Sequence, residues 1–267
     1  MTSNATSDNW REGDTYERYM GRWSRRLAPR FLQWLALPAG RRWLDVGCGT
    51  GALAAAIVDD CAPSAVSGVD PSEGFLATAG KRLPPQVRLQ RAAADALPLA
   101  DAAVDATVSS LVLNFVPDVA AALREMKRVT ADRGVVAACV WDYAGSMQMI
   151  RAYWDAAAQL GLLAPGQDEG ERFALCRPEA LAAAFAAAGL RDGTVGAIEI
   201  ETTFTDFDDY WQPFLGGQGP APAHAASLDD ASRARLREGL RERLPSQRDG
   251  RIALSARAWA ARGQVLH

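Results

Sequence analysis

Arg42 to Ala54 read RWLDVGCGTGALA, and this stretch decides the fold. It opens with an apolar pair, passes through Asp45 to three alternating glycines, and ends in an alanine-rich run. That order predicts a strand, a tight glycine turn and a helix. Glycine is needed where the backbone takes a positive φ or passes close to a ligand, because it has no Cβ to clash. The following helix directs unpaired N–H groups over the turn, so the stretch predicts a nucleotide-type pocket.

A second signal, Asp70, lies at the end of the next apolar run, residues 65–69. This is the window about 20 residues beyond the turn where an acidic side chain receives a ribose. Glycines also collect in ordinary turns, but the two signals support each other. A dinucleotide site is the alternative, because Gly47, Gly49 and Ala52 also satisfy G-x-G-x-x-G/A.

The run Asp45-Val46-Gly47-Cys48-Gly49-Thr50-Gly51 resembles the first motif of class I S-adenosylmethionine (SAM) dependent methyltransferases, of the small-molecule, UbiE-like type 11 kind. Residues 92–105, AAADALPLADAAVD, resemble the family's A/G-D-A-x-x-L-P-x-x-D-x-x-x-D segment. The resemblance runs in register from Tyr16 to Trp141 and weakens beyond. It implies an α/β fold with a doubly wound, Rossmann-like sheet of seven strands, mostly parallel with an antiparallel last strand, and helices on both faces.

The resemblance also implies SAM as the cofactor and a set of residues that bind it. Asp45 is expected on the side of the methionine amine, Asp70 against both ribose hydroxyls, and Asp95 against the adenine amino group. Taken alone, Asp95 would be interpreted as an ordinary loop aspartate, but its register after two matching motifs favours the adenine role. The expected cofactor-binding set is Tyr19, Trp23, Asp45, Gly47, Cys48, Gly49, Gly51, Asp70, Pro71, Ser72, Asp95, Ala96, Leu97, Ser110 and Leu111.

The chain of 267 residues, 49% of them hydrophobic, is expected to form a single domain over residues 1–267, because it can bury one large core. After the strand that precedes the glycine turn, the expected strands are residues 65–69, 87–90, 104–110, 135–141, 195–204 and 251–261. Residues 205–250 are too long for a plain connection between the last two strands, so they predict a lid or pocket wall. Within them, Leu228 to Leu244 predict an amphipathic helix whose arginines form a solvated face.

Residues 15–37 are expected to form an N-terminal helical cover, with Pro29 beginning a second helix there. Tyr16, Tyr19 and Trp23 recur at spacings of three and four, which places them on one helical face. This face either packs the helix on the body of the protein or covers the cofactor cleft, and the spacing does not separate the two.

Four residues are candidates for binding the methyl acceptor. Asn114 follows a strand whose end lies beside the ligand crevice of an open α/β sheet, and Trp141 ends the next strand. Tyr210 and Trp211 lie in the insertion, whose aromatic side chains offer surface to an apolar or aromatic acceptor. The alternative is that these aromatic side chains pack the insertion onto the sheet.

A general base is needed only if the accepting atom must lose a proton, because SAM itself activates the methyl group. The weak candidates are His224, Tyr143 and Asp142. His224 lies in a Pro/Ala-rich stretch that is expected to be a loop, and Asp142 and Tyr143 follow a strand, where packing explains them equally well. The sequence therefore identifies no base.

The composition and charge of the chain limit the classes of binding partner that we expect. Lys and Arg number 29 against 32 Asp and Glu, which gives a net charge of -3 and a pI near 5.5, so we expect no nucleic-acid or membrane partner and favour a small-molecule acceptor. Four scattered cysteines without a CxxC pair, and only two histidines, indicate neither a metal site nor a disulfide framework. With no apolar signal core and no run of membrane-spanning length, we expect a cytoplasmic protein.

Two other functions stay open at this point. One is an NAD-dependent oxidoreductase that uses the same turn, although it needs neither Gly51 nor the Asp95 segment. The other is a non-catalytic SAM-fold binding subunit, which the intact glycine turn and Asp70 disfavour. The identity of the acceptor, the choice between O-, N- and C-methylation, and the choice between monomer and homodimer are left open.

Overall fold

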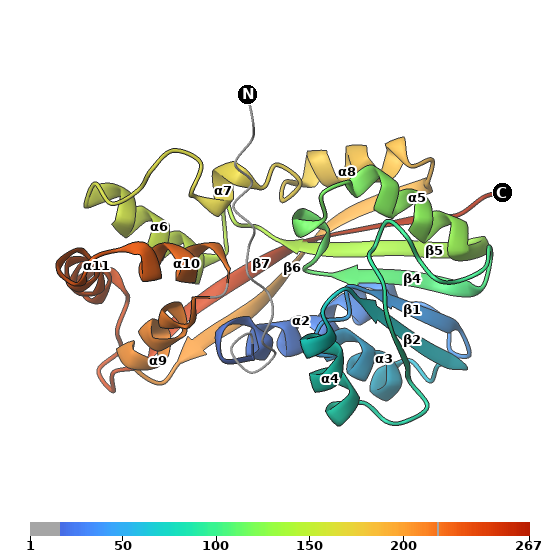
Figure 1. Cartoon of the computed structure of the whole chain (residues 1–267), viewed down its shortest axis with the longest axis horizontal. Helices are drawn as coiled ribbons and strands as arrows, with labels where there is room; N and C mark the ends of the chain where they lie inside the picture. The colour runs from blue at the N-terminus through green and yellow to red at the C-terminus, as the bar shows by residue number, and fades with distance from the viewer. Residues whose placement is uncertain (1–16, 218) are drawn as a thin grey trace.

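The computed structural model describes residues 17–217 and 219–267. Its centre is a seven-stranded sheet in the order β3-β2-β1-β4-β5-β7-β6. Helices α2, α3 and α4 lie on one side of the sheet, and α5 and α8 lie on the other (Figure 1). This confirms the predicted doubly wound α/β fold.

The strands pair as the predicted topology requires. Strands β1 to β5 form parallel neighbours, and β7 lies antiparallel between β5 and β6. Their bounds are β1 (Arg42–Val46), β2 (Ala65–Asp70), β3 (Arg88–Arg91), β4 (Val104–Ser110), β5 (Thr130–Trp141), β6 (Arg191–Phe204) and β7 (Ile252–Gln264). The last three strands are longer than predicted. Strand β5 begins earlier because Thr130 pairs with Val104 of β4, and β6 and β7 extend further because Arg191 pairs with Gln264.

The helices begin and end at residues that local chemistry favours. Ser72 caps α4 by accepting a hydrogen bond from the Phe75 amide, and Asp118 caps α5 in the same way through Ala121. The elements are η1 (Glu17–Gly21), α2 (Arg22–Leu35), α3 (Ala52–Asp60), α4 (Glu73–Arg82), η2 (Leu113–Phe115), α5 (Val119–Val129), α6 (Gln148–Gln159), α7 (Glu169–Arg172), α8 (Pro178–Ala187), α9 (Phe207–Trp211), η3 (Gln212–Gly216), α10 (Pro220–Ser227) and α11 (Asp230–Arg243).

The expectation that Pro29 begins a second helix is wrong, because Pro29 lies inside α2. Proline removes the hydrogen bond that the carbonyl of Arg25 would accept. Arg25 and Pro29 are both exposed, so water can satisfy that carbonyl. The opposite face of α2 carries fully buried Leu27 and Phe31, and this packing holds the helix together across the missing bond.

The insertion between β6 and β7 is helical and contains α9, η3, α10 and α11. It packs against α6 and the end of β6 (Figure 1). The expectation that His224 lies in a loop is wrong, since it belongs to α10. The predicted helix over residues 228–244 is confirmed as α11.

Replacing Pro29 with alanine restores the missing donor inside α2. We expect Pro29→Ala to raise the free energy of unfolding by about 1 to 2 kcal/mol, the helix gain less the entropy that proline removes from the unfolded chain. Urea denaturation measures this, with Pro84→Ala as the control because Pro84 follows α4 rather than lying inside a helix. A Pro29→Ala protein no more stable than the parent would show that α2 has already adapted to the proline.

Candidate functional site

The glycine turn after β1 is held by the neighbouring strand. Gly47, Gly49 and Gly51 have φ values of 72°, 52° and 87°, in the left-handed region. The amides of Gly47 and Cys48 both donate to the carbonyl of Val69 in β2, at 2.8 and 2.9 Å. The backbone therefore turns sharply at the carboxyl end of β1, and α3 begins directly after the turn, at the edge of the sheet where ligands bind.

Gly47 is required by space as well as by its φ. A Cβ at this position would lie 2.5 Å from the side chain of Val112, which follows β4. The close approach brings the end of β4 against the turn. Sequence spacing indicated the turn, but the contact with Val112 depends on the tertiary fold.

Asp70 ties the turn to the next helix. Its Oδ2 accepts a hydrogen bond from the Gly49 amide at 2.9 Å, and its Oδ1 accepts one from the Ser72 amide at 2.8 Å. Burial raises the pKa of Asp70, and these two hydrogen bonds oppose the rise. Each carboxylate oxygen has a second lone pair, so both remain able to accept a hydroxyl.

Asp45 is a buried carboxylate that has no hydrogen-bond partner on either oxygen among the described residues. Only 1% of the residue is exposed. Burial raises its pKa to about 7, the nearby charge of Asp70 adds to the rise, and the backbone amide of Ala54, which is near but forms no hydrogen bond of normal geometry with it, opposes the rise. Buried polar groups are nearly always paired, so two unpaired oxygens at this place indicate a ligand that donates hydrogen bonds or carries positive charge.

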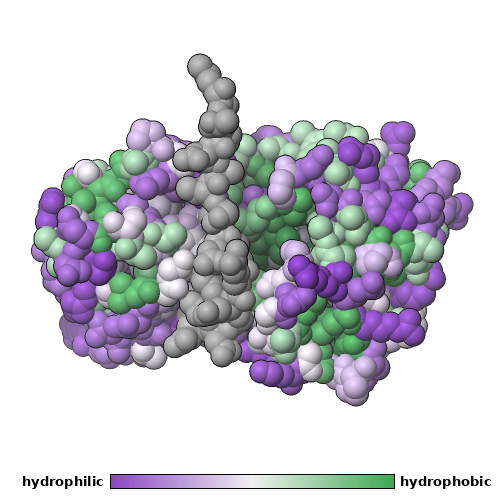
Figure 2. All heavy atoms as spheres, viewed as in Figure 1, coloured by the Kyte–Doolittle hydropathy of each residue, from purple (hydrophilic) through white to green (hydrophobic). Residues whose placement is uncertain are grey.

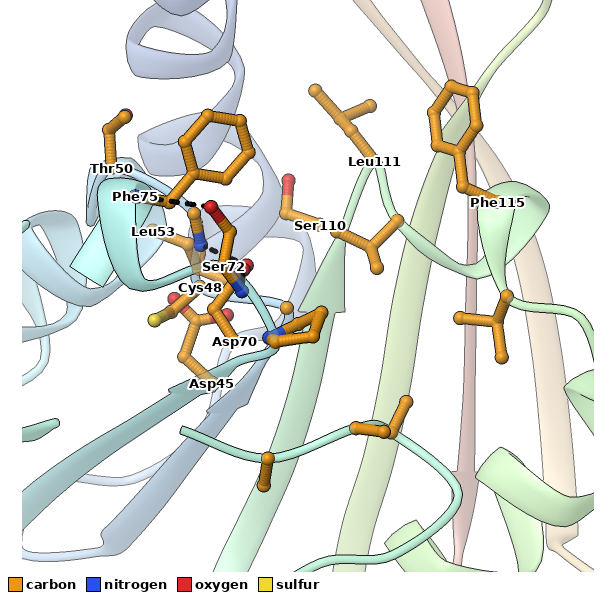
Figure 3. Close-up of a pocket in the computed structure, with 18 of the residues that line it drawn as sticks. Asp45, Cys48, Thr50, Leu53, Asp70, Ser72, Phe75, Ser110, Leu111 and Phe115 are labelled. Atoms are coloured by element: carbon orange, nitrogen blue, oxygen red, sulfur yellow. Dashed lines mark hydrogen bonds between the residues drawn. The ribbon is translucent and has the colours of Figure 1, made fainter. Parts of the chain in front are cut away.

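These groups border a cavity of about 460 Å³. Asp45, Cys48 and Asp70 lie on one side, and Leu111 and Phe115 lie across from them (Figure 3). A patch of hydrophobic side chains lies to the right of the centre in the view of Figure 2. The described lining consists of Ser24, Asp45, Gly47, Cys48, Gly49, Thr50, Ala52, Leu53, Asp70, Pro71, Ser72, Phe75, Ala92, Ala93, Ala94, Asp95, Ser110, Leu111, Val112, Phe115, Val116 and Pro117.

Most of the expected cofactor-binding residues line this cavity, and five do not. Tyr19 and Trp23 are buried in packing contacts, with ring centroids 5.6 Å from Phe214 and 5.2 Å from Phe204. Ser24, which follows Trp23 in α2, lines the cavity in their place. Gly51, Ala96 and Leu97 also lie outside the described lining.

The N-terminal cover is fastened to the turn by Glu17, a residue that sequence reasoning missed. Its carboxylate accepts a hydrogen bond from the Thr50 hydroxyl in the turn, and it forms ion pairs with Arg25 of α2 and Arg82 of α4. No motif marks Glu17, because its partners come from three separate elements. Sequence reasoning also missed the cavity residues Phe75 and Phe115, because no motif marks them and their place at the cavity depends on the tertiary fold.

The four expected acceptor-binding residues lie outside the described lining. Trp141 is buried at the end of β5, and Trp211 is buried in the insertion. Tyr210 is fully buried and donates to the Met149 carbonyl at 2.9 Å, as the packing alternative predicts. Both amide atoms of the Asn114 side chain are buried without a partner in the described chain.

The three weak base candidates have structural partners. His224 shares a hydrogen bond with the Tyr153 hydroxyl through Nδ1 (2.7 Å), and its Nε2 donates to the Leu162 carbonyl (2.8 Å). Since that carbonyl can only accept, Nε2 carries the proton, and burial lowers the pKa of His224.

Asp142 accepts hydrogen bonds from the amides of Gly145 and Ser146 at 3.0 and 2.9 Å, and thereby holds the turn before α6. Tyr143 is buried, with its ring centroid 5.5 Å from that of Phe173. None of the three candidates is in the described lining of the cavity.

Comparison with known proteins identifies the central region. Residues 44–138 match a family model described as a methyltransferase domain. This agrees with the resemblance to the SAM-dependent, Rossmann-like class, since the matched residues run from β1 into β5 and carry the glycine turn and Asp70.

Two curated relatives are similar to part of this chain. Malonyl-[acyl-carrier protein] O-methyltransferase of Geobacter sulfurreducens is 35% identical over 152 residues, 56% of this chain and 55% of the relative. The ubiquinone/menaquinone biosynthesis C-methyltransferase UbiE of Rubrivivax gelatinosus is 36% identical over 105 residues, 39% of this chain and 41% of the relative. The chain thus spans about half or less of the length of these relatives.

The fold extends beyond the matched region. A solved structure of phosphoethanolamine N-methyltransferase 2 of Haemonchus contortus, in complex with S-adenosyl-L-methionine, superposes with a TM-score of 0.57 at 16% identity. The match covers 95% of this chain and 56% of that chain. At this identity the likeness concerns the fold alone.

Within residues 17–217 and 219–267, no helix has the length and apolar character needed to cross a membrane. Over the same residues, no group of three His, Cys, Asp or Glu side chains is arranged to hold a metal ion.

The close approach of Gly47 to Val112 allows the effect of overpacking to be separated from the effect of left-handed backbone strain. We expect Gly47→Ala to lower the free energy of unfolding by about 2 to 5 kcal/mol, from left-handed strain plus overpacking. Gly40 is the matched control, since its φ is 79° and nothing lies within 4 Å of a Cβ built there. Gly40→Ala should lose only about 1 to 2 kcal/mol. Equal losses in urea denaturation would show that the Val112 contact contributes nothing.

Proposed function

We propose that this protein is a SAM-dependent methyltransferase that transfers a methyl group to a small organic acceptor by in-line displacement. The observation that carries the proposal is the unpaired, buried carboxylate of Asp45 beside Asp70, under the glycine turn. SAM has an ammonium group, a ribose with two hydroxyls and an adenine. Two carboxylates with free lone pairs next to a glycine turn fit the first two of these groups.

Each residue has a distinct role in this proposal. Asp45 pairs with the methionine amine, and Asp70 accepts the ribose hydroxyls through the lone pairs that its two backbone donors leave free. Asp95 accepts from the adenine amino group, and Leu111 provides an apolar wall. Bound SAM supplies a methyl group that is already activated by its sulfonium. The protein then has to orient the acceptor and exclude water, so no covalent residue is required.

The cavity favours a neutral and largely apolar acceptor. Among the described lining residues there is no Lys, Arg or His, whereas three carboxylates, those of Asp45, Asp70 and Asp95, are present. An anionic acceptor would meet repulsion with no cation in the described lining to offset it. The wall opposite the turn includes Leu111, Phe115 and Val116, which present apolar surface to the acceptor.

The same charges disfavour the oxidoreductase alternative. A dinucleotide brings a pyrophosphate, which needs positive charge or a free helix N-terminus. The glycine turn does open a helix, α3, but the described lining has no Lys or Arg, and two acids, Asp45 and Asp70, border the turn. We expect calorimetry on the purified protein to give SAM an affinity at least about tenfold above that of NADH.

Binding and catalysis are tested separately. Mass spectrometry of S-adenosylhomocysteine formed with a panel of neutral aromatic and aliphatic acceptors should detect turnover, and anionic analogues of the same acceptors should turn over more slowly. NADH binding tighter than SAM would overturn the proposal. Binding of SAM without turnover of any acceptor would favour the non-catalytic subunit.

The raised pKa of Asp45 predicts pH-dependent cofactor binding. Below pH 7 the carboxyl is protonated and neutral, so pairing with the ammonium of SAM requires loss of that proton. We expect SAM to bind about fivefold more weakly near pH 6 than near pH 7.2, a range in which an α-amino group stays mostly protonated. Calorimetry at both pH values measures the difference.

Two variants control the pH experiment. Asp45→Asn should bind SAM more weakly and with nearly equal affinity at the two pH values. Asp95→Asn should bind more weakly but keep the pH dependence, because Asp45 is intact. A pH dependence that survives in Asp45→Asn would assign the titration to another group.

A further inference from the structure

Two side chains of α5 brace the loop that carries Asp95. The guanidinium of Arg128 forms a two-pronged ion pair with Glu125, through Nε to Oε1 at 2.6 Å and Nη2 to Oε2 at 2.7 Å. Glu125 Oε2 in turn accepts a hydrogen bond from the Leu97 amide at 2.9 Å. The pair is therefore connected to the main chain of the loop.

Arg128 makes three further contacts with the same loop. It donates to the carbonyls of Leu97 and Leu99 at 3.1 and 2.8 Å, and to the carboxylate of Asp101 at 2.8 Å. The hydrogen bonds from Arg128 also hold the pKa of Glu125 below its usual value. One planar guanidinium thus holds three positions along the loop at once, a geometry that a lysine ammonium does not reproduce.

The loop has little else to hold it. Residues 92–103, between β3 and β4, contain no helix or strand. Asp95 lines the cavity but is exposed, and within the described chain its side chain has no hydrogen-bond or ion-pair partner. The turn at Ala93–Ala96 and the buried side chain of Leu97 are its nearest anchors. The position of the Asp95 carboxylate therefore depends on the main chain two residues away.

We infer that Arg128 and Glu125 are positioning residues for recognition of the adenine base. They lie outside the described lining of the cavity, so they act through the main chain at Leu97 rather than by touching a ligand. The inference rests on the proposed function, in which Asp95 accepts from the adenine amino group. It goes beyond that function by assigning base selectivity to a pair of residues on a helix behind the loop.

A role in stability and a role in positioning make different predictions for the pair. The side chains of Arg128 and Glu125 are 32% and 22% exposed, so water partly screens the pair, while its two-pronged geometry and its network of partners add to its contribution to folding. If the pair serves the loop, its loss should change which base is accepted more than it changes the melting temperature. This separates positioning from a merely structural role.

The test compares SAM with its hypoxanthine analogue, in which a carbonyl oxygen replaces the adenine amino group. A hydrogen bond from the amino group to a carboxylate predicts that the native protein binds SAM at least about tenfold more tightly than the analogue. Arg128→Met should reduce this preference at least about fivefold and increase hydrogen exchange at the Leu97 amide. Asp95→Ala should abolish the preference, and its ratio of affinities for SAM and the analogue gives the value expected when the hydrogen bond is absent.

A second ion pair provides the matched control. Arg42 and Asp105 form a two-pronged contact at the amino-terminal ends of β1 and β4, with side chains that are 45% and 29% exposed. Arg42→Met should leave the preference for SAM unchanged. If Arg128→Met fails to fold, Arg128→Lys keeps the charge, loses the planar fork and should show the same loss of preference.

The outcomes separate the two proposals. A protein that does not bind SAM contradicts the proposed function itself. A protein that prefers SAM, and keeps the full preference in both Arg128 variants, overturns the positioning role alone. An equal loss of the preference for SAM in Arg42→Met and Arg128→Met also overturns the positioning role, because a general destabilisation of the fold would then explain the effect.

Discussion

The carboxylate of Asp70 connects the turns that follow two neighbouring strands, β1 and β2. It accepts the Gly49 amide of the turn after β1 and the Ser72 amide at the start of α4, so one side chain sets the distance between the two βα connections. The Val69 carbonyl adds two more bonds to the turn. The cavity, the position of Asp45 and the direction of α3 all depend on this junction.

The junction places two carboxylates in a buried site, and this has a cost in stability. The pKa of Asp45 is about 7 in the folded protein and near 3.9 in an unfolded chain. Between these values the folded state binds a proton that the unfolded state releases, so the contribution of Asp45 to stability falls as the pH rises through that window. A ligand with a positive charge would relieve this penalty, as is expected where a binding site is built at the expense of the fold.

The sheet and the part of the site that is local in sequence could be predicted. The glycine turn, Asp70 and Ser72 lie at the ends of consecutive strands, and apolar runs mark those strands. The contacts of Glu17 with Thr50 and of Val112 with Gly47 could not be predicted, because their partners meet only after the helices pack. Spacing placed Tyr19 and Trp23 on one helical face, but a face that lines a cavity and a face that packs a core have the same periodicity. For the aromatic residues of the insertion, the sequence likewise did not distinguish packing in the core from lining a cavity.

The place of β7 within the sheet has a consequence for how the chain folds as it is made. Strand β6 has β7 as its partner in the sheet, and the whole helical insertion is synthesised between the two. Until residues 252–264 leave the ribosome, β5 and β6 each keep an open edge, and the apolar face of the insertion has no finished sheet to pack on. Because contacts this distant in sequence form late, the nascent chain passes through a period with exposed strand edges. We expect that stage, more than the glycine turn, to be where this fold is vulnerable to aggregation.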